Sequence, residues 1–265
     1  MSEAAVVEIS ADVRAATRDL ILALADSKRL LGTRYAEWIL GSPELETGIA
    51  CASMAQDEFG HGRLLYALLK EFGDDVDRLE HGREPAEYCN IEALDRAPES
   101  WPELVAVNAF VDAALTVQLR ALTDSSYAPL RQRVGKLLDE EAFHAVHAAA
   151  WCRRLANGSA ESRTMLATAA RRTVPITLRW FGPAGSSADV LAQAGVSNAT
   201  ADQLRTRYIE AVRPLIEAIG ELALLNQTID FSSFDAQKRR TTGSLPDADT
   251  IRRVRGDKNR AFLMD

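Results

Sequence analysis

Two stretches of this chain share one pattern: Asp57-Glu58-Phe59-Gly60-His61 and Glu140-Glu141-Ala142-Phe143-His144. In each stretch a glutamate precedes a histidine by three residues, so on a helix both side chains lie on one face and can bind one cation together. Metal centres in four-helix bundles use this arrangement: two helices each supply a Glu-x-x-His box, and the other two each supply one carboxylate. The first box (Glu58 and His61) and the second box (Glu141 and His144) therefore predict a helical bundle around a metal centre.

The rest of the sequence is typical of an all-α protein. Glycine and proline are sparse, at 15 and 9 of 265 residues, while good helix formers dominate. No stretch alternates with the period of two that a half-buried strand requires. The segments between the breaks predict six helices, at about residues 13–40, 43–72, 101–123, 128–155, 160–181 and 200–229.

The connections between these helices predict the topology. Residues 73–100 are polar and punctuated, so they read as a long crossover between two helical hairpins, as in a ferritin-like four-helix bundle. We expect Ser42 and Ser100 to cap the second and third helices, because serine before a first-turn proline is a helix-start signal. The sequence thus predicts one ferritin-like helical domain over residues 1–231, with its four-helix bundle at about 13–157 and two additional C-terminal helices. A charged C-terminal arm, 232–265, follows.

The composition limits the classes of function. The formal net charge is −7 and the sequence pI about 5.3, which argues against nucleic-acid or anionic-membrane partners. No uncharged apolar run approaches the ~18 residues that span a bilayer. The opening MSEAAVVEIS carries acids where a signal peptide needs a basic start. The three cysteines have no CxxC spacing, which is unlike a disulfide framework or a zinc knuckle. We expect a cytoplasmic protein with no nucleic-acid or membrane partner.

The two hairpin turns place an acid opposite each box. Residues equidistant from the turn of an antiparallel hairpin lie at one level, so turns near residues 42 and 126 set Asp26 against Glu58 and Asp112 near Glu141. Both aspartates lie in apolar mid-helix segments, where a carboxylate without a partner costs several kcal/mol. A set of carboxylates and imidazoles suits iron or manganese. The predicted ligands are Asp26, Glu58, His61, Asp112, Glu141 and His144.

The sequence also indicates roles for other residues near the two boxes. Asp57 and Glu140 precede the two glutamates and can each accept the far N–H of the histidine in the opposite box. We interpret His147 as a solvated side chain, with an outer position at the centre as the alternative. Glu37 lies far below the level of Glu58 and is read as structural, and Cys51 as a small core residue.

At these residues the sequence resembles the phenylacetyl-CoA epoxidase family, a group of bacterial multicomponent oxygenases. MAQDEFGHGRLLYALLKEFG (54–73) and FVDAALTVQLRALTDSSYAPLRQRVGKLLDEEAFH (110–144) resemble the catalytic subunit, and LADSKRLLGTRYAEWILGSPELE (24–46) resembles the structural subunit. Carried over residue by residue, both boxes and Asp112 match metal ligands of the catalytic subunit. Its first-helix ligand, a glutamate, falls on Lys28 here, while Asp26 matches an aspartate of the structural subunit.

The resemblance implies an oxygen-activating enzyme with two iron ions, manganese being possible at one position, and with no catalytic residue beyond the metal site. It also implies a reductase component, other oxygenase subunits, an aryl-acyl-CoA substrate that is epoxidised, and a possible homo- or heterodimer. Three groups of cations are candidates to bind the CoA phosphates: Lys28, Arg29 and Arg34; Arg153 and Arg154; Arg171 and Arg172. Two alternatives stay open, a structural subunit without catalysis and a ferritin-like iron-handling protein.

Overall fold

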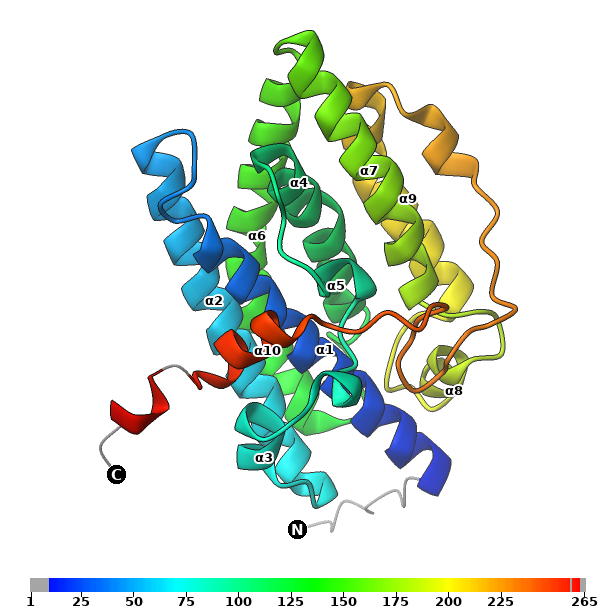
Figure 1. The fold of residues 1–265 in the computed structure, drawn as a ribbon. Helices are drawn as coiled ribbons and strands as arrows, with labels where there is room; N and C mark the ends of the chain where they lie inside the picture. Colours follow the sequence, from blue (N-terminus) through cyan, green and yellow to red (C-terminus); the bar gives the residue numbers. More distant parts are fainter. Residues whose placement is uncertain (1–9, 258, 263–265) are drawn as a thin grey trace.

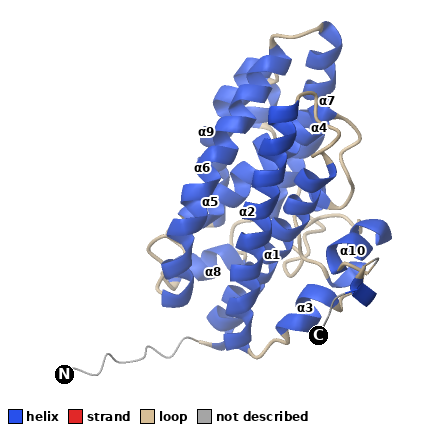
Figure 2. Cartoon of the chain, turned by 90° about the vertical axis from the view of Figure 1, so that its left-hand side faces the viewer, coloured by secondary structure: helices blue, strands red, loops and turns tan. Residues whose placement is uncertain are grey.

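The computed structural model describes residues 10–257 and 259–262, and within them the chain is all-α, as predicted. Figure 2 shows only helices and loops over this part of the chain. Two hairpins form the bundle: α1 (Ala11–Glu37) with α2 (Leu45–Leu69), and the helix made by α4 (Trp101–Ala106) and α5 (Ala113–Arg120) with α6 (Ala128–Ala156). The crossover between them carries the short α3 (Val76–His81). This is the ferritin-like arrangement that the two hairpins predict.

Capping side chains explain most of the helix starts. The Ser10 hydroxyl accepts from Val13 N at the start of α1, and the Ser100 hydroxyl accepts from Glu103 N at the start of α4. The prediction for Ser42 is wrong: α2 begins two residues after Pro43, at Leu45, and Glu44 precedes it without a side-chain cap. The Ser42 hydroxyl instead donates to the Glu44 carbonyl within the turn.

A π-helical turn, Val107–Asp112, joins α4 to α5 inside one continuous helix. The sequence predicts a regular α-helix here, and its apolar periodicity contains no signal for the wider turn. Single π-turns inside α-helices are frequent at functional sites because they redirect the side chains that follow. This one ends at Asp112, one of the predicted metal ligands.

Two further helices cover one side of the bundle, α7 (Ala160–Trp180) and α9 (Ala201–Ile219), with α8 (Ser187–Gln193) between them in the chain (Figure 1). The predicted helix 200–229 is too long. Gly220 adopts the left-handed conformation with φ of 77° and ends α9, and a 3₁₀ turn at Leu222–Asn226 follows.

The arm after residue 231 packs against the bundle, crosses in front of α1 in Figure 1 and contains α10 (Ala248–Arg255). The buried Arg240 side chain pairs with Asp95 of the crossover at 2.9 Å and donates to the Asn90 carbonyl. Thr250 of α10 accepts a hydrogen bond from Arg34 of α1. The arm therefore ties the crossover to the first helix.

The stretch Trp101–Arg120 is long and apolar enough, by composition, to cross a membrane. However, 83% of its most apolar window is buried inside the bundle, as in the core helix of a helical domain.

Candidate metal centre

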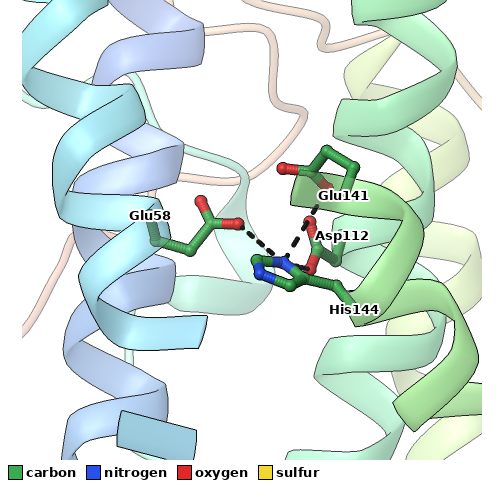
Figure 3. A group of neighbouring side chains, drawn as sticks. All are labelled: Glu58, Asp112, Glu141 and His144. Carbon is green, nitrogen blue, oxygen red and sulfur yellow. Dashed lines mark hydrogen bonds and ion pairs between the residues drawn. The ribbon is translucent and has the colours of Figure 1, made fainter. Parts of the chain in front are cut away.

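Four predicted ligands meet in the bundle core. Figure 3 shows Glu58 of α2, Asp112 at the end of the π-turn, and Glu141 and His144 of α6 pointing toward one another. All four are buried, and one ligand atom from each lies within 4.8 Å of the others. We call these four residues the cluster. The equal distance of Asp112 and Glu141 from their turn thus predicts the position of Asp112 correctly, and the spacing within the boxes predicts that both glutamates lie at the centre.

The first helix contributes a lysine to this cluster. The Lys28 Nζ atom lies 2.9 Å from Glu58 Oε1 and 3.1 Å from Asp112 Oδ1, and it also contacts Glu141 Oε1. The Lys28 side chain is 0% exposed. An ammonium therefore stands where the two-metal arrangement has the carboxylate of a fourth helix.

Asp26 is not in the cluster, so the structure corrects its predicted place. Its carboxylate pairs with the buried Arg83 guanidinium, and it accepts hydrogen bonds from the Tyr66 hydroxyl and from Cys89 N at 2.8 Å. Residues two apart on a helix point about 200° apart. Because Lys28 points to the cluster, Asp26 points away from it toward the crossover. The distance of a residue from the turn predicts its height along the bundle but not the direction in which its side chain points.

The two histidines bind carboxylates of the opposite box, as predicted. His61 Nε2 lies 2.7 Å from Glu140 Oε2, and His144 Nε2 lies 3.3 Å from Asp57 Oδ2. These contacts turn the other nitrogen of each ring inward: His144 Nδ1 lies 3.0 Å from Asp112 Oδ2, and His61 Nδ1 lies 3.3 Å from Glu141 Oε1. Such outer carboxylates fix the orientation of imidazole ligands.

Two ligand atoms at the centre have no hydrogen-bond partner among the described residues. They are Glu58 Oε2 and His61 Nδ1, both buried and both belonging to the first box. A buried acceptor without a partner costs about 1–3 kcal/mol, and such atoms are few in native proteins. Because these two atoms lie among converging carboxylates, their lone pairs are available to a bound cation.

Burial and charge set the protonation of the cluster. Burial raises the pKa of both Glu58 and Glu141 to about 7. Burial also opposes the charged forms of Asp112 and Lys28, but their mutual attraction outweighs it. The pKa of Asp112 therefore falls well below its usual value, and the pKa of Lys28 rises well above its own. Burial opposes the charged form of His144 as well, but its hydrogen bonds to the carboxylates of Asp112 and Glu58 raise its pKa to about 11. Without a metal, protons and Lys28 therefore balance the carboxylates.

Further side chains that the sequence does not single out hold the cluster in place. The Tyr35 hydroxyl donates to Asp112 Oδ2 at 2.8 Å, and the Thr116 hydroxyl donates to Glu141 Oε2 at 2.9 Å. A hydroxyl three or four residues from a ligand on the same helix is the only signal that could have indicated Thr116.

His147 is an outer member of the centre, so its reading as a solvated side chain is wrong. Its Nδ1 atom lies 3.0 Å from Asn108 Oδ1, and the Nδ2 group of the same Asn108 amide donates to the Tyr35 oxygen. The chain of contacts from His147 thus reaches the cluster through Asn108 and Tyr35.

A cavity of about 330 Å³ opens beside the cluster between α5, α6 and α9. Its walls are mainly alanines with Val117, Pro214 and Leu215, and Asp112, Glu141 and His144 line it as well. Arg120 and Arg153 also line it, and both are exposed to solvent. The cavity therefore joins an apolar chamber, a polar cluster and two surface cations.

Most of the predicted CoA-phosphate candidates are otherwise engaged. Arg153 lines the cavity, whereas Lys28 is buried in the cluster. The others form ion pairs with acidic residues: Arg29 with Glu80, Arg34 with Glu37, Arg154 with Glu44, Arg171 with Glu221, and Arg172 with Glu103. Arg120, which lines the same cavity, is missed by sequence reasoning because it stands alone in the chain.

The residues at this centre do not match the full set for two metal ions. Five of the six predicted ligands lie together, but the first helix brings an ammonium in place of the sixth. Glu37, the other acid of α1 that the sequence offers, bonds Arg34 and Arg253 and takes no part in the cluster. A single cation fits the donor set of Glu58, Asp112, Glu141 and His144.

The fold and the centre together define a ferritin-like helical bundle with a carboxylate and histidine cluster, the architecture of di-iron carboxylate proteins. The family model described as "Phenylacetic acid catabolic protein" matches residues 3–226, and the chain belongs to this family, as the resemblance implied.

Two curated relatives are subunits of one enzyme, the 1,2-phenylacetyl-CoA epoxidase of Escherichia coli K12. The chain is 30% identical to one of them over 190 residues, covering 69% of this chain and 60% of that protein. It is 28% identical to the other over 140 residues, covering 52% of this chain and 56% of that protein. The chain thus matches about three-fifths of the length of these relatives.

Proposed function

We propose that this chain is the oxygen-activating subunit of a multicomponent, cytoplasmic oxygenase of the phenylacetyl-CoA epoxidase type. Its substrate is an aryl-acyl-CoA from the catabolism of phenylacetate-like acids. The observation that carries the proposal is the apolar cavity that reaches Asp112, Glu141 and His144. Cavities of this size with few polar groups at one end are typical of sites for small organic ligands.

The cavity suits a thioester with an apolar head and an anionic tail. The alanines and Leu215 of its walls can pack on an aryl-acyl group and keep water from the cluster, which strengthens the electrostatic interactions inside. Arg120 and Arg153 are exposed cations of the cavity lining and can bind phosphates of the CoA.

The side chains around the cluster hold its ligands in fixed orientations. Thr116 and Tyr35 donate to Glu141 and Asp112, while two outer carboxylates orient the histidines. Iron bound at this centre would supply the redox chemistry that adds one atom of dioxygen to the substrate and releases the other as water, using two electrons from a reductase component. The comparisons support other oxygenase subunits as partners, because the relatives are named as two subunits of one epoxidase.

The proposal is tested with the full chain loaded with Fe²⁺ under anaerobic conditions. Phenylacetyl-CoA is the probe: its binding is measured by calorimetry, and product formation by mass spectrometry after addition of dioxygen and an electron donor. We expect binding that weakens at least about tenfold in the double variant Arg120→Gln/Arg153→Gln, since each charged hydrogen bond contributes about 1.5–3 kcal/mol. Arg163→Gln on the exposed face of α7 is the matched control. Absence of both binding and product would contradict the proposal.

A second candidate, the structural subunit of such a complex, is favoured by one specific observation. Lys28 neutralises the carboxylates that metal ions would otherwise hold together, so the bundle has a cation of its own. In that role the chain would form no product alone and would increase product formation by a catalytic homologue added to it. The same assay, run with and without that homologue, separates the two candidates.

A further inference from the structure

We propose that this centre holds one divalent cation, bound by Glu58, Asp112, Glu141 and His144, and that the Lys28 ammonium permanently takes the place of the second cation of a two-metal centre. The inference concerns the number of ions alone, so it applies to either candidate role of the chain.

The position of Lys28 is the first argument. Its Nζ atom contacts one oxygen of each of three carboxylates, from α2, the π-turn and α6. In a two-metal centre, two helices each supply a carboxylate beside the two Glu-x-x-His boxes. Here the first helix reaches the same place with a positive charge, which repels a cation at that position instead of binding it.

The charge of the buried cluster is the second argument. Glu58, Asp112 and Glu141 carry three negative charges when they act as ligands, and Lys28 carries one positive charge. The remainder of two negative charges is neutralised by one divalent ion. A second divalent ion would leave two uncompensated positive charges in the buried core, which costs several kcal/mol per charge.

The carboxylates of Asp57 and Glu140 do not change this balance of charges. Asp57 and Glu140 are partly exposed, and they lie outside the centre on the far nitrogens of His144 and His61. Their charges are therefore screened by solvent, and the balance inside the core remains that of three carboxylates and one ammonium.

The unpartnered atoms are the third argument. Glu58 Oε1 accepts a hydrogen bond from Lys28, whereas the buried Oε2 has no partner among the described residues. One carboxylate can therefore bind the ammonium and a metal ion at the same time. Asp112 binds Lys28 through Oδ1, while its Oδ2 faces His144 Nδ1 and accepts a hydrogen bond from the Tyr35 hydroxyl. His61 Nδ1 has no hydrogen-bond partner among the described residues, and the carboxylate that lies 3.3 Å from it belongs to Glu141, not to a residue of α1.

The number of ions is measured on the full chain after removal of metals with a chelator. The protein is reloaded anaerobically with excess Co²⁺ or Fe²⁺, passed through a desalting column, and analysed by plasma mass spectrometry. We expect about one ion per chain in the wild type and about two in Lys28→Glu, which restores the fourth carboxylate and removes the ammonium. Lys70→Glu, the same change at an exposed lysine, is the matched control and should stay at about one.

Two ions or none in the wild type would overturn the inference, as would a single ion in a folded Lys28→Glu variant. Circular dichroism checks the folding of each variant. The wild-type count decides on its own if Lys28→Glu does not fold, and Asp112→Asn should then lower that count because it removes a ligand. One ion without turnover would contradict the proposed oxygenase function and leave this inference intact.

Discussion

The Lys28 ammonium lies 2.9 Å from the Glu58 carboxylate, and neither side chain is exposed to solvent. This contact joins the two helices of the first hairpin at the level where the second hairpin brings Asp112 and Glu141. A buried ion pair of this kind adds little net stability over apolar packing, but removal of one partner is costly because the other charge stays buried. The consequences for stability follow from that asymmetry.

Replacement of Lys28 by methionine should destabilise the metal-free protein. It removes the Lys28 ammonium from three buried carboxylates, and breaking a buried pair costs about 3–5 kcal/mol. Urea unfolding of chelator-treated protein, followed by circular dichroism, measures the difference. Lys70→Met is the surface control and should change stability by less than about 0.5 kcal/mol. Equal midpoints for Lys28→Met and the wild type would mean that Lys28 does not hold the cluster.

Asp26 and Asp112 should respond in opposite ways to the same substitution. Asp112→Asn removes a ligand and should lower metal content. Asp26→Asn should leave metal content unchanged and lower stability by about 3–5 kcal/mol, since it abandons the buried Arg83 charge. Metal analysis and urea unfolding of both variants make the comparison. Loss of metal from Asp26→Asn would mean that Asp26 is a metal ligand after all.

The metal-free protein should become less stable as the pH rises from about 5.5 to 8.5. Burial raises the pKa of Glu58 and Glu141 to about 7 in the folded state. The stability from these groups is therefore fully present below their unfolded value and is lost as the pH rises through about 7. His144, with its pKa raised to about 11, acts in the same direction. Burial lowers the pKa of His61 and His147, so these two groups act in the opposite direction, but only below their usual pKa of 6.5.

Thermal unfolding at several pH values measures this slope, and Glu58→Gln should flatten it. Bound metal should reverse the slope below neutral pH, because protons then compete with the ion for its ligands. A metal-free melting temperature that rises with pH would show that the carboxylates of the cluster are ionised throughout.

The C-terminal arm should contribute to stability through Arg240. This side chain is 2% exposed and pairs with Asp95 of the crossover, so Arg240→Ala should cost about 3 kcal/mol or more. Arg252→Ala, on the exposed side of α10, should cost less than about 0.5 kcal/mol. A similar unfolding midpoint for both variants would mean that the arm is attached only loosely.

The sequence predicts the parts of this fold that follow from local patterns. The helical periodicity and the long crossover predict the bundle, and the three-residue spacing within each box predicts that Glu58 and Glu141 share faces with His61 and His144. The outer contacts of the acids that precede the two glutamates are predicted too, because a residue next to a ligand on a helix faces the adjacent helix.

Other features depend on direction and on distant contacts, which spacing along the chain does not contain. The face of α1 that meets the cluster is decided by Arg83 and Cys89, which bind Asp26 from the crossover. With Asp26 engaged there, Lys28 points inward. The π-turn at Val107–Asp112 and the packing of the C-terminal arm on the crossover likewise result from tertiary contacts rather than from local propensity.

Anomalous X-ray diffraction from crystals of the wild-type chain soaked with Co²⁺ tests directly whether the centre holds a single ion. We expect one anomalous peak, from an ion bound by Glu58, Asp112, Glu141 and His144, with Lys28 Nζ still in contact with the carboxylates. Two peaks a few ångströms apart, with the Lys28 side chain displaced from the cluster, would contradict it.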